Sequence, residues 1–519
     1  MLLFSNKKFI FVTSILDTKK DNYKTFTIMS VLMFVELLVV LVALWIGARY
    51  GGLALGAISG MGLAILVFGF HLKPSAPPTD VIYVIIAAVT CGSMLQASGG
   101  MDWMIQIAEK ILRKHPDRIT LLAPFTTFFL TVLVGTGHVV YTIMPIISDI
   151  ALKEGIRPER PCSIASIASQ IGITCSPIAA AVVAFSAISA ENGYHVSNIH
   201  IIMVTMPACI CGILMAVAYS WHRGVDLDKD PLFLERLKNP MQREYIYGKS
   251  ATVLDKKIEP ESKRAVYIFL VALGIIVMFS ITSMMDINLL PSFDQVQVVS
   301  GGAEQITLAN GVTESAKQLA KAGVVVAGVT EKVSEPITMV IVIQITMIAA
   351  AALMAIFCKA KLKLAISGTV WQSGMVAVVA IYGIAWMVNT YFDNYTPEIQ
   401  AMLSDLVTAY PWTIAIVFFL ASVLINSQGA VVVSMLPLAY SLGIEGWVLL
   451  GVLPSVYGYF FIPNYPSDIA TVNFDRSGTT VIGKYLFNHS FMIPGLIHVS
   501  TATIVGYFVA YLFHMMGVI

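Results

Sequence analysis

The sequence predicts an all-α polytopic membrane protein built as an inverted-topology repeat, with about ten spanning helices, two of them broken, plus two re-entrant hairpins. Three observations lead to this prediction. First, 57% of the 519 residues are hydrophobic and 12% are charged, whereas soluble chains carry about 25% charged residues. Second, the apolar residues come in segments of membrane-spanning length. Third, polar interruptions recur in the same order in both halves. The net charge of +1 argues against nucleic acid as a partner.

The apolar segments define the spans. A spanning helix needs about 20 mostly apolar residues, and the candidates are 30–48, 52–70, 81–98, 162–190, 201–221, 265–283, 337–358, 368–389, 446–470 and 491–514. A polar, basic tail, 1–28, precedes a first membrane repeat, 29–221, and the second repeat is 265–519. The second repeat contains an insertion, 286–336, whose alternating pattern predicts a small strand–turn–helix unit.

The distribution of lysine and arginine sets the orientation. The loop 222–264 holds ten of them, so we expect it in the cytoplasm. Counting spans from this loop, region 119–149 starts and ends on the cytoplasmic side, and region 411–440 starts and ends outside. Each region is too long for one span and too short for two with a loop. Each is therefore predicted to be a re-entrant hairpin, with its tip at Gly135–His138 or at Asn426–Ala430.

The two halves match element for element. Each has three spans, an amphipathic surface helix, a hairpin, a broken span and a last span. The surface helices are predicted near 101–114 and 396–408, and the breaks at Ser163–Pro177 and Tyr457–Asp468.

The two hairpins also share the position of a proline. Pro145 lies ten residues after Gly135, and Pro437 lies ten residues after Ser427. Because the hairpins enter the membrane from opposite sides, the repeats are inverted. This arrangement is typical of secondary transporters with a binding site near the midplane.

Four polar stretches inside apolar segments supply candidate binding residues. Free N–H groups at hairpin tips and helix breaks bind anions well, and non-helical backbone is tolerated at this depth only where it is buried or lines a watery cavity. We therefore predict substrate-binding residues at both tips and both breaks: Thr136, Gly137, His138, Ser169, Gln170, Thr174, Ser176, Asn426, Ser427, Gln428, Asn464, Ser467 and Asp468.

Each of these residues has a structural alternative. The tip residues could serve only to cap the hairpins, and the small polar residues of the first break could serve helix packing. Asp468 could carry a coupling cation or proton, since intramembrane acids are commonly functional, or it could pair with Arg476. Arg157 and Arg160 are either guides for dianions or part of the positive-inside pattern. Glu36 lies in the first span without an evident partner.

Catalysis, metal binding and ATP hydrolysis find no support in the sequence. It has no H-E-x-x-H motif, no Cys/His cluster and no Walker motif. The six cysteines are interpreted as small residues of membrane helices. An intramembrane enzyme using His138 and Asp468 is the rival from another class, but the repeat explains both residues without catalysis. We predict no cofactor, no catalytic residue and no metal site.

Several stretches resemble one family. "GTGHVVYTIMPII", "IRPERPCSIASIASQIGITCSP", "YPSDIATVNFDRSGTT" and "HSFMIPGL" are similar to stretches of the Dcu family of anaerobic C4-dicarboxylate transporters. The resemblance runs from about Met33 to the C-terminus. It implies a multi-pass carrier of the bacterial inner membrane for fumarate, malate, aspartate and succinate. It further implies exchange by alternating access, typically of fumarate for succinate in anaerobic respiration.

The resemblance leaves alternatives open. One is a cation- or proton-coupled uptake or efflux carrier. Another is a transporter that also serves as the regulatory partner of a membrane sensor kinase, through the loop 222–264. Carriers with similar hairpins lead us to expect a homodimer. More distantly, the hairpins look like those of the ion transporter superfamily, where a Ser-Asn-Thr-type tip precedes a proline. The chain departs from compact family members in its tail, 1–28, and its outer loop, 286–336.

Overall fold

The computed structural model gives an almost entirely helical chain. It describes residues 32–47, 49–50, 53–194, 196–248, 251–284, 287, 289–298, 305–307, 313–315, 330–462, 465–482 and 489–519. The predicted tail, 1–28, lies outside the described residues, as do Asn464 and much of the insertion 286–336.

The helices follow the predicted order in both halves. The first half contains the helix Leu32–Gly47, α2 (Leu53–Ala64, continued by a π-helical turn, Ile65–Gly69), α3 (Thr79–Ala97), α4 (Gly100–Lys114), α5 (Ile119–Val134), α6 (Val140–Lys153), α7 (Glu159–Ile171), α8 (Ala180–Glu191) and α9 (Asn198–Ser220). The loop 222–264 carries α10 (Pro231–Leu237) and α11 (Pro240–Tyr247). The second half contains α12 (Pro260–Met284), α14 (Met339–Phe357), α15 (Leu362–Ser367), α16 (Thr369–Ala409), α17 (Ile414–Ile425), α18 (Gln428–Ser441), α19 (Gly446–Gly451), α20 (Pro466–Phe474) and α21 (Met492–Met515).

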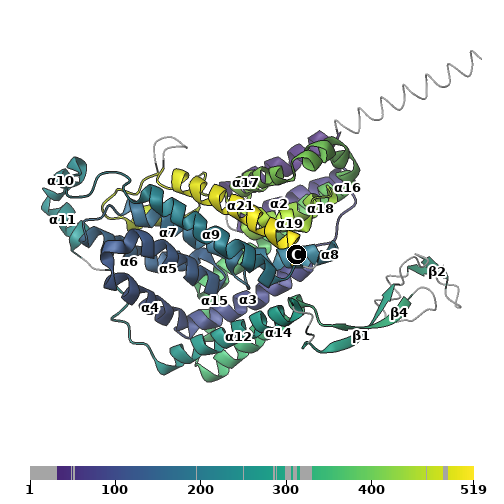
Figure 1. Ribbon diagram of the computed structural model, residues 1–519, viewed down its shortest axis with the longest axis horizontal. Helices are drawn as coiled ribbons and strands as arrows, with labels where there is room; N and C mark the ends of the chain where they lie inside the picture. The colour runs from purple at the N-terminus through teal and green to yellow at the C-terminus, as the bar shows by residue number, and fades with distance from the viewer. Residues whose placement is uncertain are drawn as a thin grey trace, which may run out of the picture.

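By their contacts, we divide the described helices (Figure 1) into two groups, which also pack on each other through α16 and α18. The scaffold bundle consists of the helix Leu32–Gly47 and of α2, α3, α12, α14 and α16; α16 packs on α2 and α3, and α14 packs on α3 and α12. The tip bundle consists of α5–α9 and α17–α21, with α21 running along α9 and α5 along α7. The helix α4 contacts α12 of one bundle and α6 of the other.

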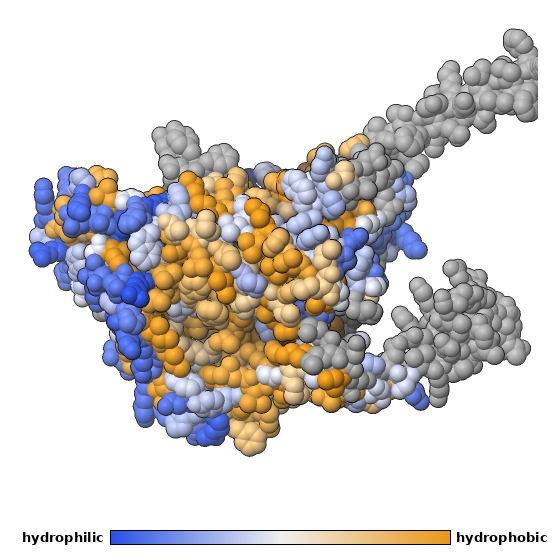
Figure 2. All heavy atoms as spheres, viewed as in Figure 1, coloured by the Kyte–Doolittle hydropathy of each residue, from blue (hydrophilic) through white to orange (hydrophobic). Residues whose placement is uncertain are grey.

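The apolar surface identifies the part of the molecule that lies in the membrane. Figure 2 shows a broad hydrophobic face over the middle of the molecule, with hydrophilic residues gathered at the end where α10 and α11 lie. Among the described residues, seven helices are long and apolar enough to span a membrane, or eight if the bent pair α3–α4 counts as one span. The predicted spans 30–48 and 52–70 are shorter apolar helices, Leu32–Gly47 and Leu53–Gly69.

The helix α4 leaves α3 at the predicted place. The two helices are bent by 72°, and Gly99, at the bend, has a φ of +76°. Glycine takes this left-handed conformation without the steric cost that a side chain imposes. The amphipathic surface helix of the first repeat is therefore confirmed as a separate element.

The equivalent region of the second repeat differs from the prediction. We expected a span, 368–389, and a separate surface helix, 396–408, but α16 is one helix of 41 residues with Pro397 inside it. A proline removes a single main-chain hydrogen bond and bends a helix without necessarily ending it. Between 390 and 408 the sequence has no glycine that could end the helix as Gly99 ends α3.

The insertion contains the predicted strands. The strands β1 (Ser292–Val298) and β4 (Thr330–Pro336) pair antiparallel, and β2 (Gln305–Thr307) pairs with β3 (Thr313–Ser315). Figure 1 shows β1 and β4 as a ribbon that extends away from the helices. The predicted helix of the insertion falls on residues outside those described.

Glu36 has a partner that the sequence did not reveal. Its side chain is fully buried, and the hydroxyl of Tyr395, near the outer end of the membrane part of α16, donates a hydrogen bond to its carboxyl oxygen at 2.5 Å. The first helix of the scaffold bundle is thereby tied to α16.

Two glycines allow α2 and α16 to cross with their backbones in contact. A Cβ atom added to Gly56 would overlap the main-chain oxygen of Val379, and one added to Gly383 would overlap that of Gly56. Small residues commonly permit such close helix packing in membranes.

Replacement of Gly56 by alanine should therefore destabilise the scaffold bundle. We expect Gly56→Ala to cost about 1–3 kcal/mol, the usual cost of overpacking, and to lower the temperature of unfolding in detergent. The matched control is Gly60→Ala on the same helix, where a Cβ atom would meet nothing within 4 Å. Equal unfolding temperatures for the two variants would contradict the proposed backbone contact.

Candidate functional site

The two hairpin tips begin with the same local structure. Gly135, with a φ of +79°, follows the end of α5, and Asn426, with a φ of +55°, follows the end of α17. The next residue in each tip is extended and caps the turn or helix that follows: a 3₁₀ turn in the first tip and α18 in the second. Thr136 Oγ1 accepts from the N–H of His138 at 3.4 Å, and Ser427 Oγ accepts from the N–H of Ala430 at 3.3 Å. The capping role that the sequence left open is therefore observed for both residues.

Because the two capping residues are equivalent, the alignment of the first tip with the second shifts by one residue from the predicted alignment. Thr136 matches Ser427 in conformation, whereas the proline spacing matched Gly135 with Ser427. Counted from the two capping residues, Pro145 lies nine positions on and Pro437 ten. The first tip continues with a 3₁₀ turn, Gly137–Val139, which the second tip lacks in its described residues.

The two broken spans are also confirmed, although the first break begins at Gly172 and not at the predicted Ser163, because Ser163–Ile171 belongs to α7. Each break packs on the hairpin of its own repeat. The first passes from α7 through a 3₁₀ turn, Gly172–Cys175, to α8, and the second from α19 through Leu453–Val456 to α20. A Cβ atom added to Gly172 would lie 2.9 Å from the main-chain oxygen of Phe128 on α5. One added to Gly458 would lie 2.5 Å from that of Phe419 on α17. The glycines let each break approach the first helix of its hairpin.

Both tips and the second break meet the last turn of α7, just before the first break, in one buried cluster. Gln428 Nε2, at the second tip, donates to the main-chain oxygen of Gln170 at 2.8 Å and to Tyr459 OH at 3.2 Å. Tyr459 OH, in the second break, donates to Gln170 Oε1 at 3.0 Å. At the first tip, the main-chain oxygen of Gly137 accepts from Ser169 Oγ at 2.6 Å. The three residues Gln170, Tyr459 and Gln428, here called the amide–tyrosine triad, thus join the two repeats.

Several buried polar side-chain atoms without a partner in the described structure lie on the tips, the breaks and the end of α7: Gln170 Nε2, Ser176 Oγ, Asn426 Oδ1, Gln428 Oε1 and Tyr457 OH. Others lie elsewhere, for example at Ser220, Ser280 and His498. Leaving a buried polar group unpaired costs about 1–3 kcal/mol. Several such atoms at the meeting point of two hairpins and two breaks indicate a place where a polar ligand completes the hydrogen bonding.

Asp468 and Ser467 lie beside this cluster at the start of α20. Both side chains are buried, and Ser166 Oγ of α7 donates to Asp468 Oδ1 at 2.7 Å. A carboxylate in the first turn of a helix is stabilised by the helix dipole. The predicted alternative was an ion pair with Arg476, but Arg476 instead forms an ion pair with Asp149 at 2.8 Å.

The side chains of Thr174 and His138 form no hydrogen bond with the amide–tyrosine triad in the described structure. Thr174 Oγ1 donates to the main-chain oxygen of Ile171 at 2.8 Å, and its own main-chain oxygen accepts from Thr205 of α9 at 3.0 Å. Thr174 therefore has the helix-packing role. The ring of His138 is half-buried and stacks on that of Tyr141, with centroids 5.6 Å apart. Asn464 lies outside the described residues.

The residues that sequence reasoning missed are mainly tyrosines. Tyr457 and Tyr459 lie in the second break, and their rings are 4.8 Å apart; Tyr465 lies 4.4 Å from Tyr459 by ring centroids. All three fall in the stretch "YGYFFIPNY", which was identified as the break. The concentration of tyrosine hydroxyls in this stretch is the sequence signal that could have identified these residues.

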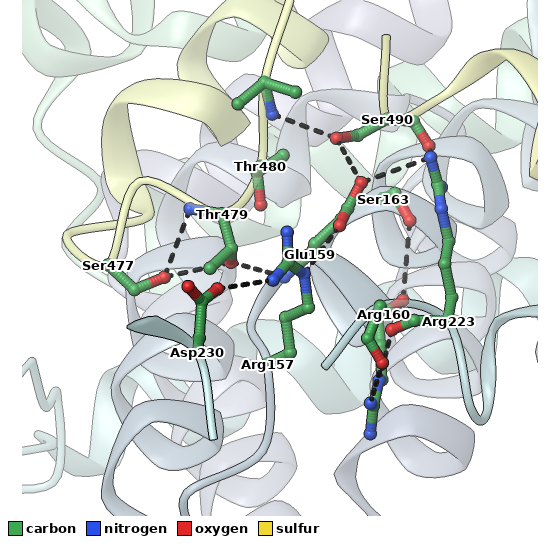
Figure 3. A network of polar contacts seen from close by, with 12 residues as sticks. Arg157, Glu159, Arg160, Ser163, Arg223, Asp230, Ser477, Thr479, Thr480 and Ser490 are labelled. Atoms are coloured by element: carbon green, nitrogen blue, oxygen red, sulfur yellow. Dashed lines mark hydrogen bonds and ion pairs between the residues drawn. The ribbon is translucent and has the colours of Figure 1, made fainter. Parts of the chain in front are cut away.

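Arg157 and Arg160 belong to a network of polar contacts with the loop 222–264 and with the segment before α21 (Figure 3). Arg157 pairs with Glu159 at 2.8 Å and with Asp230 at 2.9 Å. Arg160 pairs with Asp226 at 2.7 Å, and Glu159 also pairs with Arg223 at 3.1 Å. The network fastens the start of the loop 222–264 to the beginning of α7. This favours the structural role of both arginines over a role as guides for dianions.

Comparison with known proteins gives the family. A family model described as an anaerobic C4-dicarboxylate membrane transporter matches residues 32–514. The chain is 42% identical over 482 residues to the anaerobic C4-dicarboxylate transporter DcuB of Escherichia coli O6:H1, covering 92% of this chain and 98% of the relative. It is 32% identical to the C4-dicarboxylate transporter DcuA of Wolinella succinogenes, with the same coverages.

A solved structure of Neisseria gonorrhoeae MtrF, described as illuminating a class of antimetabolite efflux pumps, aligns with a TM-score of 0.47 and 11% identity, over 93% of this chain and 94% of that chain. The family match, in contrast, spans both repeats and confirms the resemblance that the motifs indicated. The chain belongs to the family of anaerobic C4-dicarboxylate membrane transporters, and it is a multi-pass protein of the bacterial inner membrane rather than an enzyme.

Proposed function

We propose that the protein exchanges C4-dicarboxylates, among them fumarate, malate, aspartate and succinate, across the inner membrane by alternating access. Its typical direction is fumarate uptake against succinate efflux. The family membership and the names of the relatives support C4-dicarboxylates as the substrate class. We infer the location of the site from the unpaired buried polar atoms where the tips and breaks meet.

The chemistry of this cluster suits a dianion. Hydroxyl and amide groups of Gln170, Ser176 and Tyr457 supply donors that are buried and unpaired among the described residues. The N-terminal ends of α18 and α8 also adjoin, since a Cβ atom added to Gly429 would lie 3.6 Å from the main-chain nitrogen of Ala181. Helix N-termini carry partial positive charge and stabilise anions. Neutral donors of this kind hold a dicarboxylate without a fixed opposite charge.

The position of the tips supports alternating access. The second tip lies against the scaffold bundle, because a Cβ atom added to Gly429 would lie 3.3 Å from Ile381 of α16. The site is therefore carried by the tip bundle and lies close to the boundary with the scaffold bundle. A movement of one bundle along the other would expose the same site first to one side of the membrane and then to the other.

Counterflow tests the exchange directly. Vesicles that contain the purified protein and are preloaded with succinate should take up labelled fumarate at least about tenfold faster than vesicles without internal dicarboxylate. Thr136→Ala and Ser427→Ala should each slow this uptake by about tenfold or more, because each loses a cap and a donor at a tip. Uptake that does not respond to internal succinate would contradict exchange, and wild-type rates in both variants would remove these residues from the site.

Gly137 gives a steric test of the site. A Cβ atom there would lie 2.5 Å from Gln170 Nε2, so Gly137→Ala should displace this amide and reduce fumarate uptake by about tenfold or more, at a cost in stability of about 1–3 kcal/mol. Gly274→Ala, where a Cβ atom meets nothing within 4 Å, is the control. Normal uptake in Gly137→Ala would argue against a substrate close to Gln170.

The buried position of Asp468 and its bond to Ser166 favour a second candidate, a cation- or proton-coupled carrier. If Asp468 carries the coupling ion, Asp468→Asn should lose uptake driven by an ion gradient and keep fumarate–succinate counterflow within about threefold, because exchange moves no net coupling ion. Glu445→Gln, at an exposed position, is the control. Gradient-driven uptake that survives in Asp468→Asn would exclude Asp468 as the ion carrier.

A further inference from the structure

The amide of Gln428 has only one favourable orientation. Its Nε2 atom lies 2.8 Å from the main-chain oxygen of Gln170, and a main-chain carbonyl can only accept a hydrogen bond. Turning the amide over would bring two oxygens together at that distance. The nitrogen must therefore face Gln170, and Gln428 Oε1 faces the other way, buried and without a partner among the described residues.

Tyr459 transmits this orientation to Gln170. The second hydrogen of Gln428 Nε2 points to Tyr459 OH at 3.2 Å, so the tyrosine oxygen is the acceptor there. Its single hydrogen is then left for Gln170 Oε1 at 3.0 Å. Because this bond occupies the oxygen of the Gln170 amide, Gln170 Nε2 is the end that stays unpaired. A main-chain carbonyl and one hydroxyl thus fix both amides.

The triad consequently presents one free donor group and one free acceptor. Gln170 Nε2 suits a carboxylate oxygen. Gln428 Oε1 does not, because two acceptors repel each other, and succinate and fumarate have no donor when both carboxyl groups are ionised. A buried acceptor is satisfied only by a substrate that carries a donor.

We propose that Gln428 Oε1 accepts a hydrogen bond from a hydroxyl or ammonium group on the carbon next to one substrate carboxylate, and that Tyr459 is a positioning residue that keeps the Gln170 amide turned toward a carboxylate. This proposal rests on the proposed function. It assigns Gln428 as the residue that selects 2-hydroxy and 2-amino dicarboxylates. A site built to bond such a group discriminates strongly, since it is left with an unpaired atom when the group is missing.

The test compares three variants of the full chain in proteoliposomes. Inhibition of labelled fumarate uptake by succinate, L-malate and L-aspartate is measured for Gln428→Met, Tyr459→Phe and the control Tyr440→Phe. The control removes a buried tyrosine hydroxyl that bonds Ser189 at 2.7 Å, outside the triad. Methionine keeps the approximate length of the Gln428 side chain and removes its acceptor together with the Nε2 donor that bonds Gln170 and Tyr459, so the acceptor is tested by the ratios of the constants and not by their absolute values.

Gln428→Met should raise the inhibition constants of L-malate and L-aspartate about tenfold relative to that of succinate. Tyr459→Phe should instead raise all three constants by a similar factor and keep their ratios, because Gln428 is still oriented by the main chain while Gln170 is not. Tyr440→Phe should change neither the constants nor their ratios.

Unchanged ratios in Gln428→Met would overturn the proposal, as would the same change of ratios in Tyr459→Phe. If Gln428→Met does not transport, the ligand-induced rise in unfolding temperature of the purified protein gives the same comparison of malate with succinate. If the proposed function itself is wrong, succinate will not inhibit fumarate uptake by the wild-type protein. That result differs from failure of the Gln428 proposal, in which succinate still inhibits.

Discussion

The structure depends on which hydrogen-bond partners the main-chain groups and the side-chain amides find where helices end inside the membrane. Two hairpins and two broken spans leave free N–H and C=O groups at a depth where water is scarce, and each such group is costly if unpaired. Thr136 caps the 3₁₀ turn of the first tip, and Ser427 caps α18. The amide–tyrosine triad then joins the second tip and the second break to Gln170 at the end of α7. These bonds hold the inverted repeats together at one point.

The same constraint accounts for the site. Satisfying the breaks through side chains of the opposite repeat uses some amide and hydroxyl atoms and leaves others, such as Gln170 Nε2 and Tyr457 OH, buried and unpaired in the described structure. The free-energy cost of these unpaired atoms is removed when a ligand forms hydrogen bonds with them. The membership of a C4-dicarboxylate transporter family fits such a ligand, because two carboxylates offer acceptors at both ends. The same unpaired groups therefore affect both the stability of the breaks and the binding of a dianion.

Much of this arrangement could be predicted from the sequence, and the rest could not for physical reasons. Glycines, hydroxyls and prolines inside apolar runs mark positions where a membrane helix must stop, so both tips and both breaks were found. The partners of Gln170 lie 258 and 289 residues away, and no periodic pattern links Tyr459 to it. Thr174 looked like its neighbours but bonds α9 instead. The continuity of α16 through Pro397 also depends on packing that a local pattern does not report.

A structure of the protein with fumarate bound would show whether the unpaired buried atoms at the tips form the substrate site. We expect fumarate between the two tips, with one carboxylate within hydrogen-bond distance of Gln170 Nε2 and the bonds of Tyr459 to Gln170 and Gln428 intact. Fumarate bound elsewhere, with Gln170 Nε2 still unpaired and the triad unchanged, would contradict this expectation.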